Sequence, residues 1–242
     1  MAQNIYDRPD FFAAYGELRR SREGLAGAHE WPTIRSMLPD VAGLRVVDLG
    51  CGYGWFCRWA AGQGAASVLG FDISNMMLER ARTETSDAAV TYAVADLEHL
   101  SLAENGFDLV YSSLAFHYIE DAGRLYASIH RALAPGGHLV FSTEHPIFMA
   151  PSKPGWLIGD DGRKAWPLDS YFIEGRRQTD WLSKGVVKYH RTIGTTLRLL
   201  RQAGFRVDRI EEFCPDAAQI AADPNLAEEV ERPMFLLIAA QR

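Results

Sequence analysis

Short apolar runs recur along the first two thirds of the chain, and each is followed by a segment with helical spacing of its apolar residues. The predicted strands are Val46–Leu49, Ser67–Phe71, Val90–Ala95, Phe107–Tyr111 and His138–Ser142. Runs with little in/out alternation are typical of parallel strands that are covered on both faces. Because strands alternate with helical crossovers, the pattern predicts an α/β fold with a doubly wound, mostly parallel sheet.

The remaining segments are expected to surround this core within one domain of 242 residues. We interpret residues 1–40 as a helical cap, 43–143 as the core and 144–188 as an irregular, aromatic-rich insertion that forms a lid or pocket wall. Residues 189–242 are predicted to form a helix from Tyr189 to Gln202, which Gly204 ends, and then two late strands. The prolines and glycines of the insertion break every regular period, yet its aromatic residues argue against a disordered linker.

A glycine-rich turn follows the first predicted strand, in the sequence Asp48-Leu-Gly-Cys-Gly-Tyr-Gly54. Glycine permits a sharp turn at positive φ and a close approach of the backbone to a ligand. A strand, a glycine turn and a helix together are typical of nucleotide-type sites. A dinucleotide fingerprint would need glycine at the position of Trp55, and a P-loop would need Gly-Lys-Ser/Thr, so the turn fits neither motif.

Polar residues stand at the carboxyl ends of the next strands. Asp72 comes 18 residues after Gly54, and Asp96 and Ser112 end the third and fourth strands. Ligands of open α/β sheets bind at this edge. A carboxylate such as Asp72 can accept two hydrogen bonds from a ribose diol.

The successive segments DLGCGYG, GFDIS, ADLEHL, FDLVYSSLAFHYIED and LAPGGHLVFS resemble the motifs of class I S-adenosylmethionine-dependent methyltransferases. They are similar to the small-molecule branch that includes ubiquinone- and menaquinone-biosynthesis enzymes, over about residues 43–142. The resemblance implies a Rossmann-like, seven-stranded sheet with an antiparallel last strand beside the fifth. It also implies S-adenosylmethionine as cofactor, with S-adenosylhomocysteine as its product.

Carried over by position, the resemblance assigns cofactor contacts to the glycine turn and to the strand ends. Asp72 would bind the ribose, Asp96 the adenine amino group, and Tyr15 of the cap would face the ligand. The other residues expected at this site are Asp48, Gly50, Cys51, Gly52, Gly54, Ile73, Met77, Leu97 and Ser112. For Tyr15 and Tyr6, packing of the cap onto the core is the alternative interpretation, as capping of nearby amides is for Asp48.

Three histidines are candidates for a catalytic base. His117 follows the fourth strand, His145 follows the fifth, and His190 lies near the late helix. Histidine titrates near neutrality and so suits proton removal. Each has a structural hydrogen-bonding role as its alternative, and His117 is expected to bind rather than abstract a proton.

Composition and charge limit the kinds of molecule that the protein is expected to bind. The net charge of −6 disfavours a broad phosphate-binding surface, so we expect a small-molecule methyl acceptor and no nucleic acid. The apolar run near Met234 is too short for a membrane span. Three cysteines without a CxxC pair indicate reduced thiols in a cytoplasmic protein, and no metal-ligand spacing is present. A monomer and a homodimer both remain open.

Methyl transfer by in-line displacement onto an O, N or C nucleophile is therefore the leading interpretation. A non-catalytic regulatory protein that binds S-adenosylmethionine or S-adenosylhomocysteine is the alternative, and retention of the whole glycine turn with Asp72 and Asp96 counts against it. A nicotinamide-dependent oxidoreductase is disfavoured by Trp55.

Overall fold

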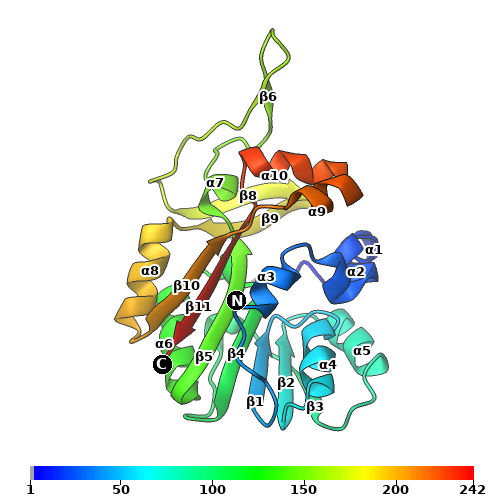
Figure 1. The fold of residues 1–242 in the computed structure, drawn as a ribbon, viewed down its shortest axis with the longest axis vertical. Helices are drawn as coiled ribbons and strands as arrows, with labels where there is room; N and C mark the ends of the chain where they lie inside the picture. The colour runs from blue at the N-terminus through cyan, green and yellow to red at the C-terminus, as the bar shows by residue number, and fades with distance from the viewer. Residues whose placement is uncertain (1–2) are drawn as a thin grey trace.

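A computed structural model describes residues 3–242 of the chain, and a seven-stranded sheet forms its centre (Figure 1). The strand order is β10-β11-β5-β4-β1-β2-β3, and β5, β4, β1, β2 and β3 run parallel. β11 is antiparallel to both β5 and β10. The strands are β1 (Arg45–Leu49), β2 (Ser67–Asp72), β3 (Val90–Val94), β4 (Phe107–Ser113), β5 (Leu133–Glu144), β10 (Arg206–Glu212) and β11 (Phe235–Gln241). The predicted fold class is confirmed, including the last strand beside the fifth.

Helices cover both faces of the sheet, which explains the continuous apolar runs. Val46 and the strand side chains on the same face of the sheet pack on α3 (Trp31–Arg35), α4 (Trp55–Gly62) and α5 (Asn75–Thr83). Val47 and Leu49 point to the other face, where α6 (Ala122–Ala132) and α8 (Ile193–Gln202) lie. Consecutive residues of a strand face opposite sides, so a strand covered on both sides must be apolar throughout.

Two element boundaries differ from the prediction. The fifth strand begins at Leu133, directly after α6, and not at the predicted His138. β9 extends to His190, so the helix predicted from Tyr189 begins only at Ile193, where the Thr192 side chain accepts from Thr195 N.

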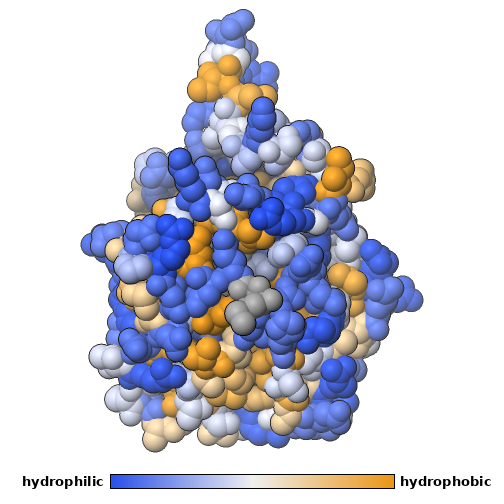
Figure 2. All heavy atoms as spheres, turned by 180° about the vertical axis from the view of Figure 1, so that it is seen from behind, coloured by the Kyte–Doolittle hydropathy of each residue, from blue (hydrophilic) through white to orange (hydrophobic). Residues whose placement is uncertain are grey.

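The insertion after β5 contains more regular structure than its sequence indicates. An antiparallel hairpin of β8 (Gly175–Trp181) and β9 (Ser183–His190) lies above the carboxyl end of the sheet (Figure 1). A short helix, α7 (Pro146–Met149), precedes β6 (Leu157–Ile158) and β7 (Lys164–Ala165), whose pairing extends away from the body. Leu157 and Ile158 are exposed, and Figure 2 shows apolar atoms on this projection.

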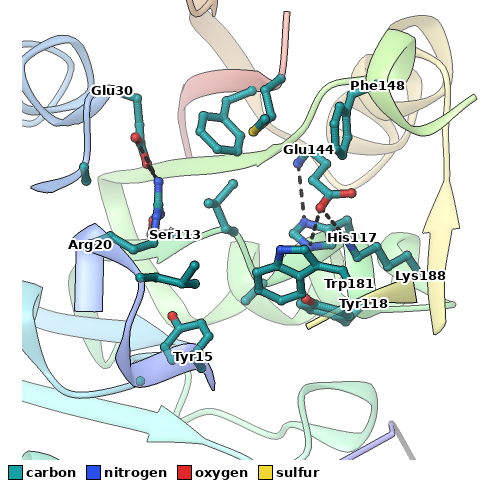
Figure 3. A pocket seen from close by; sticks show the side chains of 18 of the residues that line it. Tyr15, Arg20, Glu30, Ser113, His117, Tyr118, Glu144, Phe148, Trp181 and Lys188 are labelled. Atoms are coloured by element: carbon teal, nitrogen blue, oxygen red, sulfur yellow. Dashed lines mark hydrogen bonds and ion pairs between the residues drawn. The ribbon is translucent and has the colours of Figure 1, made fainter. Parts of the chain in front are cut away.

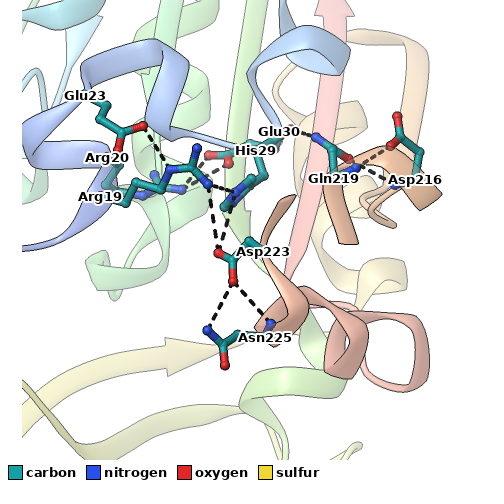
Figure 4. A network of polar contacts seen from close by, with 9 residues as sticks. All are labelled: Arg19, Arg20, Glu23, His29, Glu30, Asp216, Gln219, Asp223 and Asn225. Atoms are coloured by element: carbon teal, nitrogen blue, oxygen red, sulfur yellow. Dashed lines mark hydrogen bonds and ion pairs between the residues drawn. The ribbon is translucent and has the colours of Figure 1, made fainter. Parts of the chain in front are cut away.

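Two helical segments form a roof beside the hairpin. The N-terminal cap consists of α1 (Pro9–Gly16), α2 (Arg19–Arg22) and η1 (Gly24–Gly27). Between β10 and β11 the chain forms α9 (Ala217–Ala222), η4 (Pro224–Ala227) and α10 (Glu228–Glu231), which the sequence pattern does not predict. Figure 4 shows the polar contacts that join the two segments, among them Gln219 Nε2 donating to the carbonyl of His29 at 2.8 Å.

None of the helices within residues 3–242 is long and apolar enough to span a membrane.

Candidate functional site

The glycine turn after β1 has the positive-φ backbone that its sequence predicts. Gly50, Gly52 and Gly54 have φ values of 80°, 53° and 73°. The amides of Gly50 and Cys51 both donate to the carbonyl of Phe71, at 2.8 and 2.9 Å, which holds the turn against β2. A Cβ at Gly50 would lie 2.5 Å from that of Ala115, whereas one at Gly52 would meet nothing within 4 Å. The turn is therefore tightly packed at Gly50, against Ala115, and has open space beside Gly52.

Asp72 lies beside this turn at the end of β2. Its Oδ2 accepts from Gly52 N and its Oδ1 from Ser74 N, both at 2.9 Å. Burial raises the pKa of Asp72, and the two backbone donors oppose the shift. A carboxylate has about four acceptor positions, so each oxygen keeps one for a further donor such as a ribose hydroxyl.

The residues expected around an adenine ring also gather here. Met77 is buried on the first turn of α5, and its amide donates at 3.1 Å to the side chain of Ser74, the N-cap of this helix. Asp96 and Leu97 come from the next strand end, where Asp96 Oδ1 accepts from Glu98 N at 3.0 Å. Ile73, Met77, Asp96 and Leu97 all line one cavity with Asp72.

Two of the predicted cofactor residues do not line this cavity. Ser112 is fully buried, and its hydroxyl donates to the carbonyl of Leu49 at 2.6 Å; the following Ser113 lines the cavity instead. Gly54 is the N-cap of α4, where a Cβ would lie 2.1 Å from the Tyr92 hydroxyl oxygen. Both residues support the turn from behind.

Asp48 contributes to the cavity wall but is only 2% exposed. Burial raises its pKa to about 8, and the Cys57 thiol donates to Asp48 Oδ2 at 3.5 Å. Cys51 is likewise buried beside the cavity, and burial raises the pKa of its thiol.

The cavity has a volume of about 1170 Å³ and extends from the glycine turn to the insertion. Its far wall carries Glu144 at the end of β5, together with Trp181 and Lys188 of the hairpin (Figure 3). The N-terminal cap contributes Tyr6 and Tyr15. The space lies just above the ~300–1,000 Å³ common for small-molecule sites.

The tyrosines of the cap line the cavity and also contact other aromatic side chains. Tyr15 lines the cavity and also packs edge to face on Tyr53 and Trp181, with ring centroids 5.8 and 6.3 Å apart. The Tyr6 hydroxyl donates to that of Tyr118 at 3.1 Å. These aromatic contacts connect the cap with the hairpin across the cavity.

Of the three candidate histidines, the structure brings only His117 to the cavity. Its Nδ1 accepts from the Glu144 amide at 3.4 Å, and its Nε2 lies 3.9 Å from Glu144 Oε1 (Figure 3). Burial, with Lys188 and Arg191 nearby, holds the pKa of His117 well below its usual value. The ring is therefore neutral and a weak base.

His145 and His190 lie outside the cavity and have structural partners. His145 is completely buried; its Nδ1 accepts from Ile147 N at 3.0 Å, and its Nε2 lies 2.8 Å from Glu212 Oε1. His190 Nε2 donates to the carbonyl of Tyr171 at 2.8 Å. Burial lowers the pKa of both rings. The geometry gives neither histidine access to a ligand in the cavity.

Sequence reasoning missed a buried ion pair in the far wall. Lys188 Nζ bonds to Glu144 Oε1, and their side chains are 3% and 12% exposed. A second missed pair, Arg232 with Glu229, has an N···O distance of 2.7 Å and lies among three aromatic rings of the insertion. The alternation that could have placed Lys188 on the inner face of β9 is Val186-x-Lys188-x-His190, where all three residues are buried.

Known proteins match both the fold and the motif region. The sequence profile of the methyltransferase domain family matches residues 47–141. The crystal structure of an S-adenosylmethionine dependent methyltransferase from Mesorhizobium loti shares 61% identity, covering 90% of this chain and all of that one, with a TM-score of 0.88. The chain belongs to the S-adenosylmethionine-dependent methyltransferases. S-adenosylmethionine is the cofactor of this enzyme.

Other relatives of this methyltransferase match different shares of its length. An uncharacterised protein of Haemophilus influenzae is 35% identical over 99% of this chain and 97% of its own length. A malonyl-[acyl-carrier protein] O-methyltransferase of Hahella chejuensis is 34% identical over 119 residues. That match covers 49% of this chain and 43% of the Hahella enzyme, so the methyltransferase spans less than half of this relative.

Within residues 3–242 the methyltransferase has no group of three or more His, Cys, Asp or Glu side chains arranged to hold a metal ion. Its three cysteines are free thiols.

Proposed function

We propose that this methyltransferase transfers the methyl group of S-adenosylmethionine to a small-molecule acceptor by in-line displacement. The observation that carries the proposal is the continuous cavity, which joins the glycine turn and Asp72 at one end to Glu144 and Trp181 at the other. One ligand can occupy the end formed by the core motifs. The other end is enclosed by the insertion and fits an acceptor of limited size.

Residues at the core end fit the cofactor. The open space above Gly52 admits the methionine portion, and the remaining acceptor positions of Asp72 suit the ribose diol. Asp96 would accept from the adenine amino group, with Ile73, Met77 and Leu97 beside the ring. The cofactor supplies an activated methyl group, so the protein mainly has to align the acceptor with it. Alignment of this kind can lower a barrier by roughly 7–11 kcal/mol.

Several observations support a small acceptor. Residues of the N-terminal cap and of η4 and α10, such as Tyr15, Leu226 and Glu229, line the cavity. Figure 1 shows these segments beyond the carboxyl ends of the parallel strands. The net charge of −6 offers little attraction for nucleic acid. Free thiols at Cys51, Cys57 and Cys214 support the expected cytoplasmic location. The relatives from Mesorhizobium loti and Hahella chejuensis are both named methyltransferases, so they give no support to the non-catalytic alternative.

Replacing Asp72 tests the cofactor end. We expect Asp72→Asn to weaken S-adenosylhomocysteine binding by about 2–3 kcal/mol, because one charge-assisted hydrogen bond becomes neutral and the other is lost where an amide nitrogen, which only donates, replaces a carboxylate oxygen. This corresponds to about a 30- to 150-fold higher Kd in isothermal titration calorimetry.

The matched control is Asp87→Asn, since Asp87 is an exposed carboxylate that accepts from Ala89 N and does not line the cavity. Its Kd should equal that of the wild type. An unchanged Kd for a folded Asp72→Asn protein would remove Asp72 from the proposed site.

A further inference from the structure

Unsatisfied polar atoms are concentrated in one part of the molecule. Within residues 3–242, all but one of the buried side-chain nitrogen and oxygen atoms that lack a hydrogen-bond partner belong to residues lining the cavity; the exception is Nδ1 of His190. Buried polar groups in folded proteins are normally paired. Their concentration here indicates that ligands complete these bonds. At the acceptor end the unpaired atoms are Glu144 Oε2, Thr179 Oγ1 and Arg177 Nε.

Glu144 Oε2 and Glu229 Oε2 are the two carboxylate oxygens among the unpaired atoms, and Glu229 belongs to the pair with Arg232, whereas Glu144 stands beside the hairpin. Oε1 of Glu144 bonds to Lys188 Nζ and lies 3.9 Å from His117 Nε2. Lys188 and His117 thus lie on the Oε1 side of the carboxylate (Figure 3), while Oε2 is buried without a hydrogen-bond partner in a residue that lines the cavity. A carboxylate oxygen is an acceptor, so its missing partner must be a donor.

The surroundings of Glu144 are aromatic. Lys188 Nζ lies 5.1 Å from the ring centroid of Trp181 and 6.0 Å from that of Tyr118. Tyr15 approaches the same Trp181 ring from the cap. Aromatic rings of this kind stack on or contact edgewise another planar ring. The donor that reaches Glu144 is therefore best carried by an aromatic molecule.

We propose that Glu144 is a catalytic residue, and that the acceptor is a phenol whose hydroxyl donates to Glu144 Oε2 and is methylated. The inference rests on the proposed methyl transfer and specifies its acceptor class. A phenol resembles the tyrosine side chain, whose pKa is about 10, so it is mostly protonated near neutrality and a weak nucleophile. It must lose its proton to react well, and a positioned base serves this need.

The reaction at this site balances without another reagent. The phenol oxygen forms its bond to the methyl carbon while the carbon–sulfur bond of S-adenosylmethionine breaks, and the sulfur keeps the electron pair of that bond. The O–H bond breaks in the same event, and Glu144 Oε2 takes the proton. Burial raises the pKa of Glu144, which makes the carboxylate a stronger base. Lys188 opposes this shift and holds the carboxylate in place.

Two probes that differ in one hydrogen-bond donor test the binding part. Phenol can donate to Glu144, whereas anisole, its methyl ether, cannot. With protein saturated in S-adenosylhomocysteine, we expect phenol to bind at least about tenfold more tightly than anisole in calorimetry, as one charge-assisted bond allows. The double variant Glu144→Gln/Lys188→Met removes both charges together and should reduce this preference below about threefold. Equal binding of the two probes, or binding of neither, would overturn the proposal.

A kinetic comparison separates catalysis from positioning. Glu144→Gln should lower kcat for phenol by about 100-fold or more, the usual minimum for a general base. For 4-nitrophenol assayed above its own pKa the acceptor is already ionised, so the loss should be less than about tenfold. An equal loss on both phenols would show that Glu144 only supports the structure and would contradict the proposal.

The control variant is Glu211→Gln, because Glu211 is exposed, pairs with Arg209 and lies outside the cavity. It should leave both rates unchanged. S-adenosylhomocysteine binding by the wild type is measured alongside. Its absence would refute the proposed function, whereas intact binding without a preference for phenol refutes only the role of Glu144.

Discussion

Asp48 lies within β1, and its carboxyl group is 2% exposed between the sheet and α4. Burial is the main cause of its raised pKa, and the negative charge of Asp72 adds to the shift. In the unfolded chain an aspartate has a pKa near 4. The folded protein therefore binds a proton here that the unfolded chain releases.

The stability of the protein should fall with pH because of this one residue. Its favourable contribution is complete below about pH 4 and is lost as the pH rises through the folded pKa of about 8. Between these values we expect a decrease in the free energy of unfolding of up to roughly 1.4 kcal/mol per pH unit. Urea denaturation of the wild type and Asp48→Asn at about pH 5 and about pH 9 measures it.

Asp48→Asn should be more stable relative to the wild type at the higher pH, since the amide does not ionise. Asp40→Asn is the matched control, because Asp40 is exposed and accepts from Ala42 N. A constant difference in stability between Asp48→Asn and the wild type across this range would contradict the raised pKa.

Residue-level prediction succeeded where the backbone itself dictates the residue type. The turn at Gly50 and Gly52 requires positive φ, and a carboxylate such as Asp72 at a strand end is recognisable from spacing. Histidines carry no comparable signal. His145 and His117 both follow strand ends, yet only the folded chain shows that one ring points to Glu212 and the other to the cavity.

At the scale of elements, the N-terminal segment is attached to the core by Asp7. Its carboxylate accepts from the Ser74 hydroxyl at 2.6 Å and from the amides of Met76 and Asn75 at 3.1 and 3.3 Å. A residue far away in sequence thus helps to cap α5, directly beside the cofactor end of the cavity. These bonds lower the pKa of Asp7 against the effect of burial.

Replacing Asp7 should loosen the cap and weaken cofactor binding together. Loss of a helix cap costs about 0.5–2 kcal/mol, so Asp7→Ala should reduce the free energy of unfolding by about that amount. We also expect faster release of S-adenosylhomocysteine in stopped-flow fluorescence. Asp10→Ala is the control, because Asp10 lies in the same cap and its pair with Arg8 is exposed. Equal effects of the two substitutions would exclude a special role of Asp7.

The elements that sequence reasoning missed share a physical reason. β8 has the sequence Gly-Arg-Arg-Gln-Thr-Asp-Trp181, and its residues alternate between partly buried and exposed without an apolar face. Only Trp181 signals burial there, because the inner face borders a cavity and not an apolar core. The short helices α9 and α10 lie at the surface and lack a sustained apolar stripe, so their periodicity was not detectable. The largely apolar core strands β1 to β4 were predicted to within two residues at each end, whereas β5 begins five residues before its predicted start at His138.

For the whole molecule, the cavity wall is assembled from distant parts of the sequence. The cap meets η4 near Asp223, whose Oδ2 lies 3.9 Å from His29 Nε2 and 4.0 Å from Arg19 Nη1 (Figure 4). The cap also reaches the hairpin, where Gln3 Nε2 donates to the Gly185 carbonyl at 3.1 Å and Gln3 Oε1 accepts from Val187 N at 3.0 Å. A ligand held between these parts should stabilise all of them at once.

Hydrogen exchange should reveal this coupling. At 100 times its Kd, a ligand adds about 2.7 kcal/mol to the stability of the folded protein. With S-adenosylhomocysteine bound, we expect slower amide exchange in the cap, in the β8–β9 hairpin and in α9. β10, which lies at the sheet edge away from the cavity, should change least among exposed elements. Protection confined to the glycine turn would show that the roof does not respond to the cofactor.

The two hydrogen bonds between the Gln3 side chain and the β8–β9 hairpin also affect where a purification tag can be placed. An affinity tag fused ahead of Gln3 would add bulk beside Gly185 and Val187, next to the strand that carries Lys188. A tag after Arg242 would instead leave from the end of β11 that pairs with the start of β5, at the opposite edge of the sheet (Figure 1). Protein tagged at the carboxyl terminus should therefore give the kinetic constants of the untagged enzyme.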